Sequence, residues 1–292
     1  MARGRTTTSS RGAERGLAAA LCALALAGCG GDSEDAEPQA TPEPPAWNHD
    51  PDDATLGPAS WDDVDESFER CLTGRAQSPV DIAGTVPTEL PPLELTYAAT
   101  PLVVENTGHT VEVSMSEGSD QTLTIADDEY RLVQYHFHAP SEHTLAGRSY
   151  DLEAHLVHEN DAGEKAVVSV LLDEGAPPSP LVESVLRNAP EEAGEEAEVD
   201  EEWSPIALLG VEGSSTVVAR YSTYRGSLTT PACDEGVRWI VLEDTLRVSR
   251  TATDRFHELI SGFPEYDGYE NNNRPTQPLN GRMIENSETE SG

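Results

Sequence analysis

Short runs of β-branched and other apolar residues recur along most of the chain, and turn-forming residues separate them. Runs of this length and composition are typical of β-strands. Apolar residues at helical spacing occur in only two segments, 179–188 and 251–260. The pattern predicts a mainly β (α+β) single domain with short peripheral helices. The strand-like runs are 102–105, 110–115, 121–125, 130–138, 150–158, 166–172, 217–221 and 237–242.

The charge of the chain excludes one large class of partners. Its 292 residues carry 54 acidic and 18 basic side chains, a formal net charge of −36. Nucleic-acid binding depends on clustered lysine and arginine, so a nucleic-acid partner is excluded. The same balance argues against electrostatic docking on anionic lipid. It indicates a soluble, self-repelling surface, which would also suit salty surroundings.

The N-terminal residues read as an export signal. Basic residues precede an apolar run at 17–27, which is too short to span a bilayer, and the run ends in LAGC at 26–29. LAGC resembles a bacterial lipobox, so we expect residues 1–28 to be a lipoprotein signal peptide and Cys29 to carry lipid. The protein would then be exported and held on the extracytoplasmic side of the cell envelope by lipid alone. The alternative is an ordinary signal peptide with an incidental cysteine.

An acidic linker and a polar tail flank the predicted domain, and a second acidic segment lies within it. Residues 29–46 are rich in proline and acids and predict an extended linker, residues 47–285 form the domain, and 286–292 form a polar tail. The acidic segment 190–202 predicts an exposed loop. If Cys22 leaves with the signal and Cys29 carries lipid, Cys71 and Cys233 remain, and a disulfide is the default expectation in an exported domain. A shared metal site is the alternative, although neither cysteine belongs to a CxxC motif.

Four histidines concentrate the chemistry in two neighbouring strand-like runs. His136 and His138 are two residues apart and share one face of a strand, whereas His155 and His158 are three apart and lie on opposite faces. If the two strands pair antiparallel, one histidine of the second completes a triangle. Three neutral imidazoles leave a tetrahedral zinc ion one open position for water. A histidine alone in a strand is more often a core or surface residue, and an HxH pair alone is weak evidence.

The acid and amide beside these histidines strengthen the metal interpretation. Gln134 lies two residues before His136, and Glu153 two before His155, each on its neighbour's face. Groups in such positions fix the tautomer of a ligating imidazole.

At this point the sequence resembles the alpha carbonic anhydrases over residues 47–282. The resemblance implies a single domain around a twisted, mostly antiparallel central sheet of about ten strands with short helices around it. Taken together, the matching motifs are highly specific to that family, and they keep its order. They are QSPVDI at 77–82, NTGH at 106–109, QYHFH at 134–138, SEH at 141–143, EAHLVH at 153–158, GSLTTP at 226–231 and RPTQPL at 274–279.

The resemblance implies a role for each matching residue. His136, His138 and His155 would bind zinc, with Gln134 and Glu153 holding the rings. Thr229 would accept a hydrogen bond from zinc-bound hydroxide and donate its own to Glu142, Thr230 would contact bicarbonate, and His109 would be the proton shuttle. Cys71 and Cys233 match the bridged pair of exported members. The apolar wall for carbon dioxide would comprise Val157, Val167, Leu228, Val237 and Trp239, which with Thr229 and Thr230 form the implied substrate site.

The implied activity is reversible hydration of carbon dioxide to bicarbonate and a proton, through attack by zinc-bound hydroxide. Inhibition by sulfonamides is expected with it. One alternative is a catalytically weak, carbonic anhydrase-like zinc-binding envelope lipoprotein. Others are a binding protein that only presents the fold, and an acidic lipoprotein that scavenges zinc or wall cations. All three zinc histidines, Glu142 and Thr229 are present, which favours the enzyme.

One departure from the family pattern concerns the start of the domain. The family commonly has Trp-Gly-Tyr there, whereas this chain has Trp47, Asn48 and His49. The tyrosine that often joins the active-site water network is therefore missing or replaced by His49. This departure bears on proton transfer, not on zinc binding.

Overall fold

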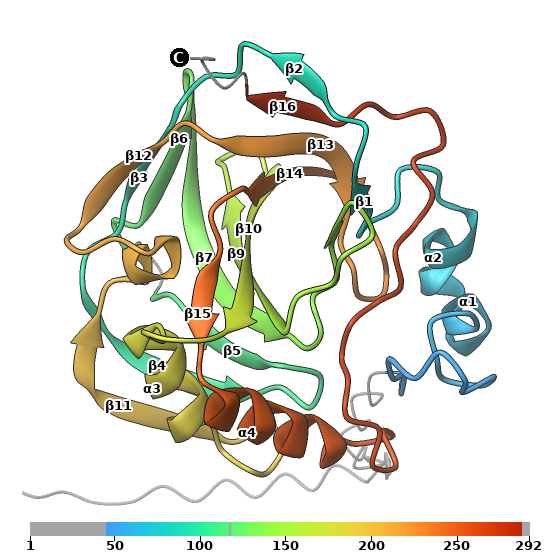
Figure 1. Ribbon diagram of the computed structural model, residues 1–292. Helices are drawn as coiled ribbons and strands as arrows, with labels where there is room; N and C mark the ends of the chain where they lie inside the picture. The colour runs from blue at the N-terminus through green and yellow to red at the C-terminus, as the bar shows by residue number, and fades with distance from the viewer. Residues whose placement is uncertain (1–44, 117, 288–292) are drawn as a thin grey trace, which may run out of the picture. The chain divides into compact units, whose positions relative to one another are not determined.

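Residues 45–116 and 118–287 are described by a computed structural model, and they fold around one large β-sheet (Figure 1). The predicted signal peptide, Cys29 and nearly all of the predicted linker lie outside these residues. The described helices are α1 Trp61–Val64, α2 Arg70–Thr73, α3 Pro180–Asn188 and α4 Arg250–Ser261, with the 3-10 helices η1 Glu66–Phe68 and η2 Pro205–Leu209.

Strands make up most of the regular structure, which confirms the predicted mainly β class. In chain order they are β1 Asp81–Ile82, β2 Val86–Thr88, β3 Leu93–Thr96, β4 Thr100–Asn106, β5 Val111–Ser114, β6 Thr122–Ile125, β7 Asp128–His138, β8 Thr144–Leu145, β9 Leu152–Glu159, β10 Lys165–Glu174, β11 Glu196–Trp203, β12 Ser215–Val218, β13 Tyr221–Ser227, β14 Glu235–Leu242, β15 Leu246–Val248 and β16 Glu285–Ser287.

The main sheet has fourteen strands, and its path runs β11-β4-β5-β7-β9-β10-β14-β13-β16-β2. Most neighbours pair antiparallel, while β10 pairs parallel with β14 and β15, and β16 pairs parallel with β2. The strands β3, β6, β12 and β15 lie off this path, and β1 pairs with β8 in a separate small sheet. The ten strands of the path agree with the expected number, and the four others extend the sheet beyond it.

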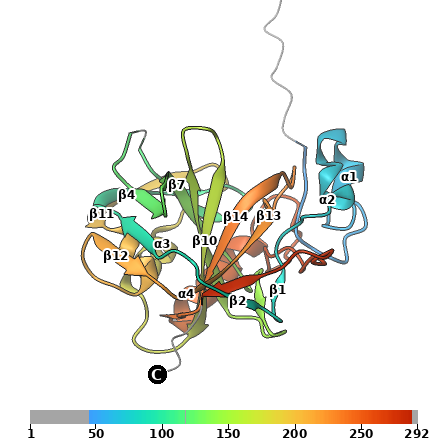
Figure 2. The same cartoon turned by 90° about the horizontal axis from the view of Figure 1, so that it is seen from above.

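The two faces of the sheet pack against different clusters. Along β10, Val168 and Val170 belong to the large core, which also contains buried residues of α3 and α4, while Val167 and Leu171 belong to a smaller cluster. This alternation follows from the two-residue period of a strand. Figure 2 shows α1 and α2 on the opposite side of the domain from β11 and α3.

Three sequence expectations need correction. The acidic segment 190–202 is not wholly a loop, because β11 pairs antiparallel with β4 and only the residues before it form a turn. The run 217–221 is not one strand. Its first residues belong to β12, which pairs with β3, and its last residue begins β13, which pairs with β14. Residues 286 and 287, assigned to the tail, lie in β16.

Candidate metal centre

The middle of the sheet brings three of the predicted histidines together. β7 and β9 pair antiparallel, so that His136 lies opposite His155 and His138 lies opposite Glu153. One ligand atom from each of His136, His138 and His155 lies within 4.8 Å of the other two. His158 points to the other face, where its Nε2 contacts the hydroxyl of Tyr97. The strand period therefore divides the four histidines as the sequence predicted.

The second nitrogen of each imidazole is held by an oxygen acceptor. His136 Nδ1 donates to Oε1 of Gln134 at 2.8 Å, and His155 Nε2 donates to Oε1 of Glu153 at 2.8 Å. His138 Nδ1 donates to the backbone carbonyl of Asn272 at 2.8 Å. These partners fix the tautomers, so Nε2 of His136, Nε2 of His138 and Nδ1 of His155 keep their lone pairs.

The free nitrogens fit a zinc ion. Nε2 of His138 is buried and has no hydrogen-bond partner among the described residues, as expected of an atom that awaits a ligand. Burial lowers the pKa of His138 to about 4, and it also lowers the pKa of His136 and His155. The three rings are therefore neutral at pH 7, which is the form that binds metal. Three imidazoles make a donor set typical of a catalytic zinc site.

A second group of potential ligands, His143, Glu153 and His155, is already hydrogen-bonded internally. His143 Nδ1 donates to Glu153 at 2.7 Å, and His143 Nε2 lies 2.7 Å from the hydroxyl of Tyr224. Both nitrogens of His143 are thus engaged. The group supports the ring of His155 and is not a second metal site.

Glu142 lies against the open side of the three histidines. Its Oε1 accepts the backbone N–H of Arg274 at 2.8 Å, and its Oε2 lies 3.6 Å from His138 Nε2 without a hydrogen-bond partner among the described residues. Burial raises the pKa of Glu142, while His155, the Arg274 N–H and the Thr229 hydroxyl oppose that shift. The Thr229 hydroxyl thus lies beside the Glu142 carboxylate.

The predicted apolar wall gathers in one place. Val167, Val237 and Trp239 are buried in the smaller cluster, and Val157 and Leu228 pack against it. The ring centroid of Trp239 lies 4.8 Å from that of His155, so the wall adjoins the metal position. Thr230, next to Thr229, is partly buried.

His109 lies in a turn whose Gly108 has a φ of 82°. Its ring stacks on Trp47 with centroids 3.8 Å apart, and its Nδ1 has no partner in the described part of the chain. Burial lowers the pKa of His109 to about 4, so the ring is neutral at pH 7. His49 is wholly buried beside it, and its Nδ1 lies 2.5 Å from the hydroxyl of Tyr266.

Sequence reasoning did not assign two buried residues that organise the site. Besides holding His138, Asn272 donates from its side chain to the carbonyls of His109 and Phe137, each at 3.0 Å. Arg274 was noticed only as part of a motif, yet it reaches Glu142, Gln77 and the carbonyl of Cys71. In the sequence, both residues are marked only by the polar run NNNR at 271–274.

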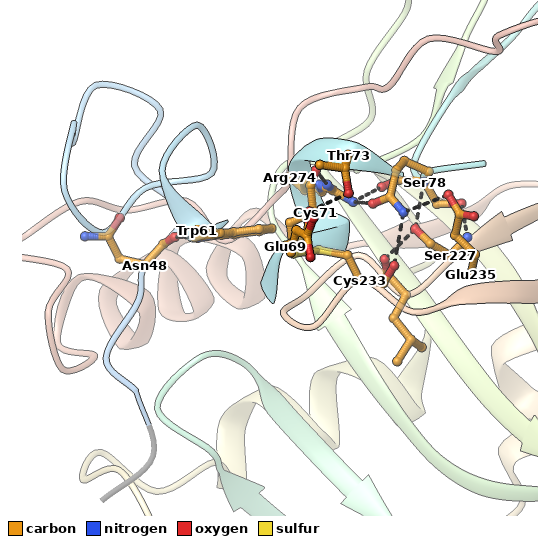
Figure 3. Close-up of a disulfide and its surroundings, with 12 residues drawn as sticks. Asn48, Trp61, Glu69, Cys71, Thr73, Ser78, Ser227, Cys233, Glu235 and Arg274 are labelled. Atoms are coloured by element: carbon orange, nitrogen blue, oxygen red, sulfur yellow. Dashed lines mark hydrogen bonds between the residues drawn. A yellow bond between two sulfur atoms is a disulfide. The ribbon is translucent and has the colours of Figure 1, made fainter. Parts of the chain in front are cut away.

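The predicted disulfide between Cys71 and Cys233 is confirmed, with Cα atoms 5.0 Å apart (Figure 3). It links α2 to the loop after Thr229, whose ends are also joined by the bond from the N–H of Cys233 to the carbonyl of Thr230 at 2.8 Å. Figure 3 shows Arg274 beside Cys71, which connects the bridge to Glu142. None of the helices in residues 45–116 and 118–287 has the length and apolarity of a membrane span.

Known proteins resemble this chain along most of its length. Residues 56–288 match the family model of the eukaryotic-type carbonic anhydrases. A carbonic anhydrase of Klebsiella pneumoniae is 37% identical over 227 residues, which cover 78% of this chain and 86% of that protein. The alpha carbonic anhydrase of Thermovibrio ammonificans, solved with the inhibitor sulfanilamide, is 36% identical with a TM-score of 0.72 over 83% of this chain and 99% of its own. A carbonic anhydrase of Chlamydomonas reinhardtii, solved with acetazolamide, is 34% identical with a TM-score of 0.69 over 82% and 99% of the two chains.

Proposed function

The chain belongs to the alpha carbonic anhydrase family, and from this premise we propose that it hydrates carbon dioxide with a zinc ion held by His136, His138 and His155. One observation carries the proposal. Each of the three imidazoles has one nitrogen held by an oxygen acceptor, and the other three nitrogens converge beside Glu142. Zinc at that point would supply the Lewis acidity that lets water ionise near neutral pH, a property for which carbonic anhydrases are the standard example.

The residues around the metal position divide the remaining work. The Glu142 carboxylate accepts a hydrogen bond from the Thr229 hydroxyl, which leaves the Thr229 oxygen to accept a hydrogen bond from the reacting water. That pair orients a lone pair of the water oxygen toward the substrate carbon. Val237, Trp239 and their neighbours hold carbon dioxide in an apolar environment, and Thr230 hydrogen-bonds the bicarbonate product.

Proton release is assigned to His109. In its stacked position on Trp47 the ring is neutral at pH 7 and its buried Nδ1 has no partner in the described part of the chain, and its pKa of about 4 makes it a weak proton acceptor in this position. The residue as a whole is only partly buried, and an imidazole that buffer can reach can pass a proton on. His49, which stands in the sequence where the family commonly has a tyrosine, contacts the hydroxyl of Tyr266 through Nδ1.

Stopped-flow carbon dioxide hydration tests the assignment. We expect hydration well above the buffer rate, inhibition by a sulfonamide, and loss of activity and of bound zinc in a His138→Ala variant. The matched control is His257→Ala, which removes a partly exposed imidazole on α4 and should change neither quantity. One bound zinc with hydration no faster than buffer would reject the enzyme and favour the catalytically weak zinc-binding lipoprotein.

We also propose that the protein is exported and lipid-anchored through Cys29. The support is the LAGC motif at 26–29 and the disulfide, which is typical of an oxidising compartment. Expression with a radiolabelled fatty acid should label the parent protein and not a Cys29→Ser variant. Equal labelling of the two proteins would reject the anchor, and a soluble, unlabelled parent would favour an ordinary signal peptide.

A further inference from the structure

A row of glutamates crosses the main sheet and ends beside His136 of the candidate metal centre. Glu196 of β11 lies directly opposite Glu105 of β4, and Glu105 lies opposite Glu112 of β5. Glu112 in turn lies opposite His136 of β7. Residues directly opposite each other in an antiparallel pair point to one face, with Cβ atoms about 4.5–5.5 Å apart. The three glutamates, which we call the acidic row, therefore share the face of the sheet that carries the metal position.

The burial of neighbouring residues independently supports the orientation of Glu112. Val111 and Val113, on either side of it, are wholly buried in the large core. Glu112 therefore points to the opposite face, because successive side chains of a strand alternate. It is only partly buried, and its Oε1 accepts a hydrogen bond from the Ser114 hydroxyl at 3.0 Å on the same face. Glu112 is thus a carboxylate held next to His136.

The negative charge of the acidic row is not neutralised. Among residues 45–116 and 118–287, no lysine or arginine forms an ion pair with any of its three glutamates. Burial raises the pKa of Glu112, the Ser114 hydroxyl opposes that shift, and the charge of Glu105 adds to it. Carboxyl groups ordinarily titrate near pH 4, so Glu112 is ionised at pH 8. An unpaired charge at this place repels anions that approach the metal position and attracts cations.

We propose that Glu112 is a specificity-determining residue of the metal centre, which disfavours anionic ligands and favours ligands that carry a positive charge. The proposal rests on the proposed function and adds the class of ligand that this site prefers. Uncharged carbon dioxide is not repelled, whereas bicarbonate is, so the charge favours release of the product. Small inorganic anions that compete with water for the metal are disfavoured in the same way.

The test compares two sulfonamides of similar size on the zinc-loaded full chain. The compound 4-carboxybenzenesulfonamide is an anion at pH 8, 4-(aminomethyl)benzenesulfonamide is a cation, and the sulfonamide group that would bind zinc is the same in both. Isothermal titration gives the two dissociation constants, and their ratio isolates the effect of the remote charge. An ionic strength of about 0.15 M largely screens charges more than about 8 Å away. We expect the parent protein to prefer the cation.

Single substitutions along the sheet separate Glu112 from the general acidity of the chain. Glu112→Gln keeps the shape and should reduce the preference for the cation roughly fivefold, since one charge acts oppositely on the two compounds. Glu112→Asp keeps the charge and should retain most of the preference. Glu105→Gln, one strand or about 4.8 Å farther away, should reduce the preference roughly twofold.

The matched control is Glu94→Gln, which removes the same charge from the same sheet. Glu94 is exposed on β3 and lies in one row with Thr124 and with Glu129 of β7, seven positions before His136. At about 3.3 Å per residue this row lies roughly 20 Å from His136, beyond the screening distance. The preference for the cation should therefore be unchanged in this variant.

A parent protein that binds both sulfonamides equally would overturn the proposal, and so would a Glu112→Gln variant that keeps the full preference. It would also be overturned by an equal loss in Glu94→Gln, which would point to general acidity, or in Glu112→Asp, which would point to side-chain shape. These outcomes leave the proposed function intact. If neither sulfonamide binds and carbon dioxide is not hydrated, the proposed function fails and this inference fails with it. If Glu112→Gln does not fold, the comparison of Glu105→Gln with Glu94→Gln decides.

Discussion

At the scale of single residues, Glu153 organises the candidate metal centre without facing the metal position. Its two oxygens accept from His155 Nε2, His143 Nδ1, the His143 backbone N–H and the Ser169 hydroxyl. Burial raises the pKa of Glu153, but His143 and His155 outweigh burial and hold the pKa well below its usual value. The ionised carboxylate thus keeps Nδ1 of His155 free to bind metal.

Replacing Glu153 with glutamine should weaken zinc binding. Both imidazoles donate to Oε1 of Glu153, while Oε2 accepts the His143 backbone N–H. A neutral amide either turns its NH2 group toward that backbone N–H or, flipped, toward both imidazoles, and it lacks the negative charge that holds the His155 ring. We expect zinc affinity to fall about 10- to 100-fold, the usual effect of losing such a partner. Competition with a chelator at pH 7.5 measures it. Glu159→Gln, at the exposed end of the same strand, is the control, and equal affinity of Glu153→Gln and parent would contradict the argument.

The limits of sequence prediction at this scale follow from what fixes each contact. His136, His138, Gln134 and Glu153 could be placed because the strand period alone decides which side chains share a face. The contact between the Asn272 carbonyl and His138 could not be predicted, because it depends on the path that the chain takes 134 residues later. Backbone groups carry no signature in residue type, so contacts of this kind need the tertiary structure.

At the scale of secondary-structure elements, a β-bulge in β7 sets which side of the sheet the histidines face. Pairing with β9 shifts register between Leu132 and Gln134. Tyr130 and Leu132 are buried before the bulge, and Tyr135 and Phe137 are buried after it, so the buried positions change from even to odd numbers. One extra residue in a strand has this effect. The bulge therefore lets one strand fill the core and still present His136 and His138 to the metal position.

Deleting Val133, the exposed residue within the bulge, should leave the metal site in place. Leu132 and Gln134 already pair with two consecutive residues of β9, so the shortened strand would pair regularly and keep every side chain on its present face. We expect one bound zinc and a largely unchanged midpoint of urea unfolding. Zinc analysis and circular dichroism measure both, with Val133→Thr as a control that keeps chain length. Loss of zinc in the deletion variant but not in Val133→Thr would show that the bulge itself is required.

The disulfide should stabilise the loop that carries Thr229. It joins residues 162 apart in the sequence, and removing such a link typically costs about 2–5 kcal/mol of unfolding free energy. We expect the double variant Cys71→Ser, Cys233→Ser to lose about that much in urea unfolding. Amides of residues 228–234 should also exchange faster with solvent. Faster exchange throughout the domain and not in this loop would argue against a local role.

Prediction of the elements failed where strand partners come from distant parts of the chain. β11 reads as a solvated acidic segment, because an edge strand has one free side and tolerates charged residues. Only its pairing with β4 makes it a strand. The run 217–221 looks like one continuous strand, because nothing in its composition marks the point where the chain stops pairing with β3 and begins to pair with β14.

At the scale of the whole molecule, two opposing electrostatic effects depend on pH. The net charge of −36 destabilises the compact chain through self-repulsion, which salt screens and acid relieves. Acting the other way, burial lowers the pKa of six histidines, which are His49, His109, His136, His138, His155 and His158. Carboxylates titrate mainly near pH 4 and unfolded histidines near 6.5, so between pH 7 and 5.5 the histidines dominate.

The metal-free protein should therefore lose stability as the pH falls from 7 to 5.5. In this window the unfolded chain takes up protons that the folded chain, with its lowered histidine pKa values, does not, so the free energy of unfolding decreases with decreasing pH. His138 and His158, with pKa values of about 4, should each contribute about 1 kcal/mol of that loss. Urea unfolding with a chelator present measures it. His158→Gln should flatten the dependence, His257→Gln should not, and a stability that is constant or rises toward pH 5.5 would show that relief of carboxylate repulsion prevails even there.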